Sequence, residues 1–188
     1  MKPRIGIALT GSFCTFASVL KVLEELKDYD LTPIMSQTAG STDTRFGTSE
    51  DFRRRLEDLC GRSVLTQLTA VEPLGPKKLL DALVVIPCTG NTLGKLANGI
   101  ADSPVTLACK AHLRNGKPVI LALSTNDGLL GSAENIGKLL SRKHYYFVPF
   151  RQDDPVEKPY SLVAHMDLLP QTIAYALEGK QLQPLLRP

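Results

Sequence analysis

Residues 82–104 read ALVVIPCTGNTLGKLANGIADSP, and the fold class can be predicted from the pattern of this stretch. It begins with a run that is apolar on consecutive positions and ends at Pro87, a pattern typical of a strand buried on both faces of a parallel sheet. A loop of small polar residues follows and opens a helix. Ser103 and Pro104 then mark the next helix, as its N-cap and its first residue. A strand that leads through a polar loop into a helix is the repeating unit of α/β proteins.

The same alternation runs through the rest of the chain. It implies right-handed crossovers, so we predict an α/β, Rossmann-like fold of three layers, a parallel sheet with helices on both faces. Ligands of such sheets bind at the carboxyl ends of the strands. The predicted strands are 4–10, 31–36, 82–87, 118–124 and 145–149, and the predicted helices are 13–28, 49–60, 91–101, 104–114, 129–142 and 165–179.

Length and composition indicate one globular domain. We expect it to cover residues 1–188, with a C-terminal tail at 181–188. Hydrophobic residues make up 43% of the chain, and a net charge of +3 is too small to indicate a nucleic-acid partner. The basic run Arg53-Arg54-Arg55 is interspersed with acids, so we interpret it as a solvated, salt-bridged helix face.

The chain shows no pattern of a membrane or metal protein. Its N-terminal apolar run stops at Thr10, too early for a signal peptide, and no apolar stretch approaches the ~20 residues of a membrane helix. We therefore expect a cytoplasmic protein with no membrane contact. The four cysteines include no C-x-x-C pair, so no metal site is predicted.

The turn after the first strand, Thr10-Gly11-Ser12, is a candidate phosphate site. Free backbone N–H groups and the positive end of a helix dipole meet there. Gly11 would let a ligand approach the backbone, and Ser12 offers a hydroxyl. A purely structural interpretation is equally open, in which Ser12 is an N-cap and Gly11 a tight turn.

Missing motifs narrow the choice of nucleotide. The chain has no G-x-G-x-x-G, and the second strand runs into Ser36-Gln37-Thr38 without an acid for a ribose hydroxyl, which disfavours a nicotinamide dinucleotide. No G-K-[ST] is present, which excludes a triphosphatase P-loop. A mononucleotide with one phosphate fits better.

The helix predicted after Pro87 contains two glycines, Gly94 and Gly99. Each interior glycine costs about 1 kcal/mol relative to alanine, so we expect a flat ligand or another protomer to approach closely there. Thr89, Asn91 and Thr92 offer groups suited to neutral polar edges. We interpret Asp102 as part of the cap or turn before the next helix.

These motifs resemble the superfamily of homo-oligomeric flavin-containing cysteine decarboxylases. Its members are similar in the T-G-S turn, a serine that ends strand two, and a proline–small–Asn-Thr segment before an A-N-G-I-A-D helix. The resemblance implies a flavoprotein domain that binds FMN, in a homo-oligomer built from trimers. Carried over by position, the flavin site would comprise Gly11, Ser12, Ser36, Thr38, Thr89, Gly90, Asn91, Thr92 and Ser124.

A closer resemblance, to the family of dipicolinate synthase B subunits, covers nearly the whole chain. It implies the oxidation of dihydrodipicolinate to dipicolinate in the mother cell of a sporulating bacterium. It also implies a partner, the A subunit of dipicolinate synthase, that binds NAD(P). The matching runs are TDTRFG at 42–47, EPLGPK at 72–77, STND at 124–127, QDDP at 152–155 and ALEGKQ at 176–181.

Catalytic residues are harder to assign. The superfamily's decarboxylases use a histidine after the third strand, whereas this chain has only His112, His144 and His165, which we interpret as surface or capping residues. Arg45 is a candidate to clamp a substrate carboxylate. Further cations near strand ends are Lys95 and Arg151, and the catalytic candidates are Asn91 and Arg45.

Two other functions stay open at this stage. The chain could be a stand-alone FMN-dependent decarboxylase or flavin prenyltransferase, although the missing histidine disfavours the decarboxylase. It could also be a non-catalytic scaffold that completes an active site held by the nicotinamide-binding partner.

Overall fold

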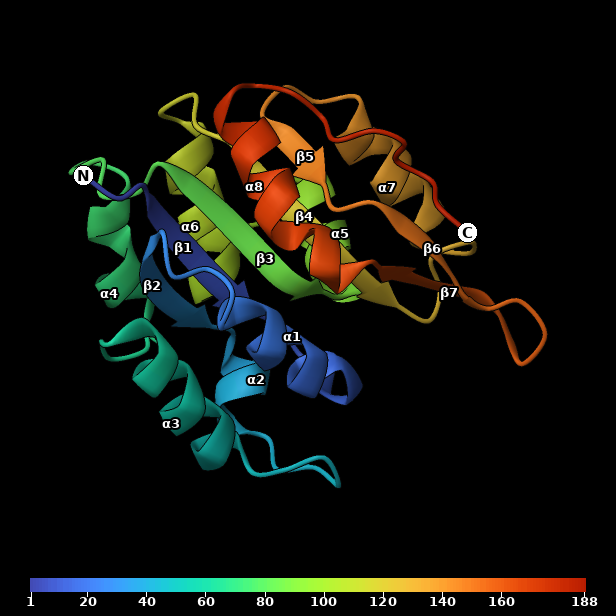
Figure 1. Ribbon diagram of the computed structural model, residues 1–188, viewed down its shortest axis with the longest axis horizontal. Helices are drawn as coiled ribbons and strands as arrows, with labels where there is room; N and C mark the ends of the chain where they lie inside the picture. The colour runs from blue at the N-terminus through green and yellow to red at the C-terminus, as the bar shows by residue number, and fades with distance from the viewer.

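Seven strands form one mixed sheet in the computed structural model, which describes residues 1–188 (Figure 1). The strand order is β2-β1-β3-β4-β7-β6, and β5 also pairs with β4. The strands are β1 (Arg4–Leu9), β2 (Asp30–Met35), β3 (Ala82–Cys88), β4 (Val119–Thr125), β5 (Tyr145–Phe147), β6 (Phe150–Asp154) and β7 (Lys158–Ala164).

The five predicted strands form the parallel part of this sheet, from β2 through β1, β3 and β4 to β5. The α/β, Rossmann-like fold class is confirmed. The sheet is mixed because the chain adds an antiparallel hairpin, β6–β7, which pairs with the last two residues of β4. Strand β6 is mostly polar and the first three residues of β7 are exposed, so the hairpin lacks the long apolar run that marks a strand buried on both faces.

Helices cover both faces of the sheet. Helices α1 and α8 lie on one face, while α5 and α6 lie on the other and α7 packs beside α5 and β5 (Figure 1). The short helices α2 and α4 were not predicted. The helices are α1 (Phe16–Leu23), α2 (Gln37–Ser41), α3 (Ser49–Cys60), α4 (Leu68–Val71), α5 (Gly90–Ala97), α6 (Pro104–Leu113), α7 (Ala133–Leu140) and α8 (Leu169–Leu177).

The two glycines of the α5 region have different roles. Gly94 lies inside α5 and faces α7, where an added Cβ would lie 3.6 Å from Asn135 Nδ2. The expectation that Gly99 lies inside the helix is wrong, because α5 ends at Ala97. Gly99 has φ +72°, a left-handed conformation typical of the residue that stops a helix, and no atom lies within 4 Å of its virtual Cβ. Gly99 thus needs no ligand to explain it.

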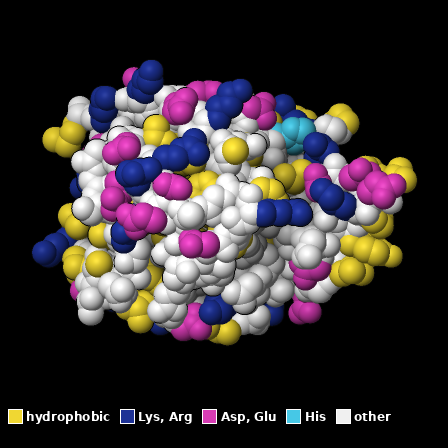
Figure 2. Space-filling view, turned by 90° about the horizontal axis from the view of Figure 1, so that it is seen from below, with side chains coloured by type: hydrophobic (Ala, Val, Ile, Leu, Met, Phe, Trp, Pro, Cys, Tyr) yellow, Lys and Arg dark blue, Asp and Glu magenta, His cyan; other side chains and the backbone are white.

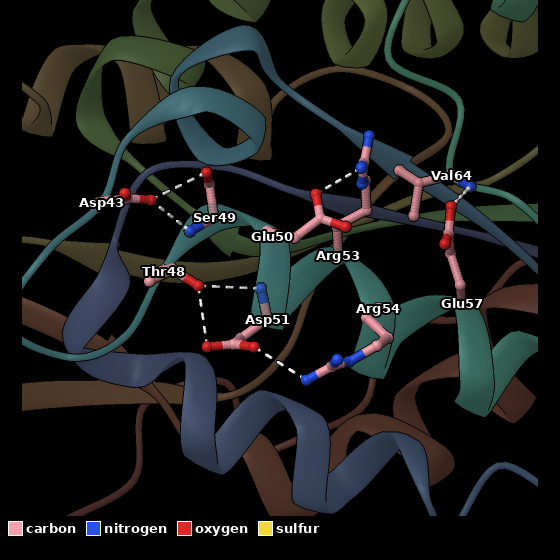
Figure 3. A network of polar contacts seen from close by, with 9 residues as sticks. All are labelled: Asp43, Thr48, Ser49, Glu50, Asp51, Arg53, Arg54, Glu57 and Val64. Carbon is pink, nitrogen blue, oxygen red and sulfur yellow. Dashed lines mark hydrogen bonds and ion pairs between the residues drawn. The ribbon is translucent and has the colours of Figure 1, made fainter.

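The basic run on α3 forms the salt-bridged face that its sequence indicates (Figure 3). Arg53 pairs with Glu50, and Arg54 pairs with Asp51 at 2.9 Å. Thr48 begins the helix, since its side chain accepts a hydrogen bond from the Asp51 backbone N–H at 3.1 Å. Figure 2 shows a face on which cationic and anionic side chains alternate without a broad patch of either sign.

Two further observations concern membranes and metals. None of the helices combines the length and the apolar character that crossing a lipid bilayer requires. No cluster of three or more His, Cys, Asp or Glu side chains is placed to hold a metal ion.

His112 is buried, so its interpretation as a surface or capping histidine is wrong. It lies in α6 with 3% of its surface exposed, and its Nε2 has no hydrogen-bond partner. Burial lowers the pKa of His112 to about 4, although a hydrogen bond to the Pro118 backbone opposes the shift. The side chain is therefore neutral near pH 7.

Helix α3 allows a test of capping against surface charge. We expect Thr48→Ala to lower the free energy of unfolding by about 0.5–2 kcal/mol, because it removes the N-cap. Arg53→Gln should change it by less than about 1 kcal/mol, because exposed ion pairs contribute little. Urea denaturation of both variants is the measurement, and equal losses would contradict this assignment.

The buried histidine predicts loss of stability in acid. The folded-state pKa of His112 lies below that of an ordinary histidine, so the unfolded chain binds the extra proton and stability falls as the pH drops from about 6.5 to about 4. Between pH 7 and pH 5 the wild type should lose about 2 kcal/mol more than His112→Gln. Urea denaturation at both values tests this, with His144→Gln as the exposed control that behaves like the wild type.

Candidate functional site

The direction of the chain creates a crevice between β1 and β3. From β1 the chain crosses to β2 on one side, whereas from β3 it crosses to β4 on the other. The carboxyl ends of β1 and β3 therefore lie side by side with their following loops pointing apart. This is the switch point at which open α/β sheets bind ligands.

A buried threonine joins the two strand ends. Thr10 is 1% exposed, and its Oγ1 donates to the Pro87 carbonyl at 2.6 Å. The same oxygen accepts a hydrogen bond from the Thr89 backbone N–H at 3.2 Å. Because both its donor and acceptor are used, the Thr10 hydroxyl fixes the turn after β1 against the turn after β3.

Two adjoining cavities open over these turns, of about 780 and 350 Å³, within the usual range for ligand sites. They share Gly11, Thr89 and Asn91. The larger cavity also contains Ser12, Gly90, Ser124 and Arg45. The smaller one has no hydrophobic lining residue and also contains Ser36, Thr38, Thr92 and Lys95. All nine residues of the predicted flavin site thus line one or both of these adjoining cavities, which together are called the cleft.

Capping roles fall to residues other than Ser12. Ser12 precedes a short 3-10 helix, Phe13–Thr15, but its side chain makes no capping bond. Its hydroxyl instead lies 2.7 Å from the Ser124 hydroxyl at the end of β4. Ser36 caps α2 by accepting from the Ala39 N–H at 3.2 Å. The N-cap interpretation of Ser12 is therefore wrong for its side chain, which faces the cleft.

Asn91 is the second residue of α5 and does not cap it. The cap is Thr89, whose Oγ1 accepts from the Thr92 backbone N–H at 3.3 Å. Asn91 is exposed and lines both cavities. Its amide is thus presented at the helix N-terminus, where the dipole is positive.

Gly90 is required by a polar cluster that the residue pattern did not reveal. Asp127 Oδ1 accepts hydrogen bonds from the hydroxyls of Thr125 and Ser132, and the Thr125 bond is the larger cause of a lowered Asp127 pKa. A Cβ on Gly90 would lie 2.6–2.7 Å from Ser132 Oγ, Asp127 Oδ1 and Thr125 Oγ1. Only the STND run after strand four pointed to this region.

The candidate cations differ in how free they are. Arg45 Cζ lies 4.9 Å from the centre of the Phe46 ring and makes no ion pair. Lys95 is paired with Asp102 at 2.8 Å, in the segment before α6. Arg151 lines neither cavity, because its guanidinium donates to the Gln152 and Asp153 carbonyls at 2.7 Å.

A family model described as Flavoprotein matches residues 1–162. The chain belongs to the flavoprotein family. It is 48% identical to the B subunit of dipicolinate synthase from Bacillus subtilis (strain 168) over 185 residues, which cover 97% of this chain and 92% of that protein. The predicted resemblance to this family is confirmed.

Solved structures agree with this assignment. The crystal structure of the dipicolinate synthase B subunit from Bacillus halodurans C superposes with a TM-score of 0.91 at 43% identity, over 100% of this chain and 99% of that one. The FMN-dependent cysteine decarboxylase SpaF superposes with a TM-score of 0.69 at 20% identity, over 95% and 96%. At that identity it shares the fold alone.

One difference separates this flavoprotein from the pattern expected of a decarboxylase. None of His112, His144 and His165 lines either cavity. The polar side chains that do line the cleft offer hydroxyls, amides, carboxylates and amino or guanidinium groups, and apolar side chains and the exposed thiol of Cys14 line the larger cavity as well. Such a set can bind and orient anions and polar rings.

The crowding at Gly90 gives a test with an internal control. Gly90→Ala should destabilise the protein by about 1–3 kcal/mol, because the new methyl group must displace three polar atoms. Gly137→Ala places a methyl group in open space on α7 and should be neutral or stabilising by up to about 1 kcal/mol. Thermal and urea denaturation of both variants measure this. Equal stability of the two variants would show that the side chains around Asp127 can move away from the new methyl group without loss of stability.

Proposed function

We propose that this chain binds FMN in the cleft and acts as the flavin-binding subunit of a dipicolinate synthase. In this proposal it takes part in the oxidation of dihydrodipicolinate to dipicolinate, in the mother cell of a sporulating bacterium, with the NAD(P)-binding A subunit of the enzyme. The observation that carries the proposal is the polar cleft at the β1/β3 switch point, in a chain 48% identical to a dipicolinate synthase B subunit.

The residues of the cleft fit a mononucleotide. Gly11 has no side chain, so a ligand can approach its backbone closely. A Cβ at this position would also crowd Thr38, whose Cγ2 would lie 3.2 Å away. Next to Gly11 the hydroxyls of Ser12 and Ser124 are free of capping duty and suit a phosphate. No acid follows β2 to hold the ribose of a dinucleotide, since Ser36 caps α2 there.

The charges of the cleft are compatible with an anionic ligand. Each of its three carboxylates is already engaged by the protein: Asp102 by Lys95, Asp153 by Lys158 and Asp127 by two hydroxyls. Engaged carboxylates repel an incoming phosphate less than free ones would. The neutral groups of Ser36, Thr38, Thr89, Gly90, Asn91 and Thr92 would meet the polar edges of the flavin.

The chemistry divides between the flavin and the chain. FMN, when bound, supplies an acceptor for two electrons. The chain's own residues bind and orient the substrate, and Arg45 is the candidate to hold a carboxylate because its guanidinium is unpaired and offers two parallel donors. Asn91, at the start of α5, presents its amide to the larger cavity, where the substrate would lie in this proposal.

Alternative functions receive less support. Several structural relatives are named decarboxylases, but they share 19–28% identity with this chain, and no histidine lines the cleft. A scaffold without a cofactor would not need the exposed Asn91 amide or the cavity-facing hydroxyls of Ser12 and Ser124, which bond only to each other among the strand-end residues. We also expect a trimer-based homo-oligomer, and a structural relative is named a dodecameric FMN-dependent decarboxylase.

Flavin titration of single variants tests the proposal. The wild type should bind FMN more tightly than NAD. Ser12→Ala should weaken FMN binding about tenfold or more, since hydrogen bonds to charged groups are worth roughly 1.5–3 kcal/mol. It should lower stability by no more than about 0.5–1.5 kcal/mol, because the hydrogen bond to Ser124 is lost but no cap is. Asn91→Asp should also weaken it, through charge repulsion with the anionic cofactor. Ser141→Ala, at the end of α7, is the control with unchanged affinity. Tighter binding of NAD than of FMN would refute the proposal.

A further inference from the structure

The β6–β7 hairpin forms one wall of the larger cavity. It contributes Asp153, Lys158 and Ser161–Val163 to the lining. Its base is held firmly, because Val163 and Leu162 pair with the last residues of β4 and the Leu129 N–H donates to the Tyr160 carbonyl at 3.0 Å. Its tip projects away from the body of the molecule (Figure 1).

Lys158 is the cation that this hairpin brings to the cleft. Its Nζ lies 2.7 Å from Asp153 Oδ2, and 58% of its side chain is exposed. Cys14, from the short 3-10 helix that follows β1, lines the same cavity as Lys158. The lysine therefore faces the ligand end of the sheet. An exposed ion pair of this kind contributes little stability, so a ligand anion can exchange with Asp153.

Arg45 and Lys158 are the cations that line the larger cavity, and they come from different walls. Arg45 belongs to the loop between α2 and α3, and its guanidinium lies over the Phe46 ring. Apolar surface is available beside each cation, from Phe46 on one wall and from Leu162 and Val163 on the other. Two cations from different walls of one partly apolar cavity suit a planar ring that carries two carboxylates.

We propose that Lys158 is a substrate-binding residue that exchanges Asp153 for one carboxylate of a planar aromatic dicarboxylate while Arg45 binds the other. The inference rests on the proposed function, because it takes the flavin to occupy the strand-end side of the same cleft. It adds a residue that determines substrate specificity, because two cations would favour a dicarboxylate ligand over a monocarboxylate one.

Dipicolinate and pyridine-2-carboxylate are the probes that test the two-cation arrangement. Titrations of the FMN-loaded chain would follow the flavin absorbance, and titrations of the flavin-free chain would use calorimetry. We expect Lys158→Gln to weaken dipicolinate binding about 10- to 100-fold, the value of one hydrogen bond to a charged group. Pyridine-2-carboxylate, which Arg45 can hold alone, should change by less than about threefold. Lys158→Arg should restore most of the affinity for dipicolinate.

The control is Lys180→Gln, since Lys180 is paired with Glu178 at 2.9 Å and lines neither cavity. Its affinities for FMN and for both probes should equal those of the wild type. Asp153→Asn separates exchange from a structural role. By removing the competing carboxylate it should strengthen dipicolinate binding, whereas a purely structural ion pair predicts that Asp153→Asn and Lys158→Gln weaken it equally.

The outcomes separate this inference from the proposed function. The role of Lys158 is overturned if the Lys158→Gln variant binds dipicolinate as tightly as the wild type does. It is also overturned if the variant loses affinity for both probes equally, even if FMN still binds. A wild type that fails to bind FMN, yet binds dipicolinate in a Lys158-dependent way by calorimetry, overturns the flavin proposal and supports the role of Lys158.

Discussion

The cleft depends on two hydrogen bonds made by the hydroxyl of Thr10. This hydroxyl is buried where β1 and β3 end, and it is satisfied on both sides by the backbone around Pro87 and Thr89. A buried hydroxyl without partners would cost free energy, so the two turns are held where they supply those partners. Because the chain leaves these neighbouring strands in opposite directions, the space beyond Thr10 stays open to a ligand.

Around this point some cleft residues bond to the backbone through their side chains, whereas others do not. Ser36 and Thr89 satisfy helix N-termini, and Asp127 collects two hydroxyls against Gly90. Ser12, Ser124 and Asn91 have no such duty. A site built this way keeps its geometry when the ligand is absent, because its supporting hydrogen bonds do not involve the ligand. The hydroxyls and the amide that do not cap a helix are groups that a phosphate and a polar ring can bond to.

The antiparallel hairpin extends this arrangement beyond the parallel sheet. It pairs with Ser124 and Thr125, so residues that close the cleft are attached to the same strand end that contributes Ser124. The parallel part of the sheet was predictable, since β1, β3 and β4 are apolar on consecutive positions and are buried on both faces. The hairpin was not, because β6 is a mostly polar edge strand and the first three residues of β7, which lies between β4 and β6, are exposed.

Local sequence determined the five parallel strands, the course of α3 with its salt-bridged face, and the polar turns that follow β1, β2, β3 and β4, because each depends on neighbours a few residues apart. All nine proposed flavin contacts lie in or beside those turns. Only the tertiary structure decided what each group does there. Ser12 meets Ser124 across 112 positions, Thr10 meets Pro87 across 77, and His112 is buried against other parts of the chain. Periodicity reports which face of an element is apolar, but a hydrogen-bond partner or a desolvated imidazole depends on segments that meet only when the sheet assembles.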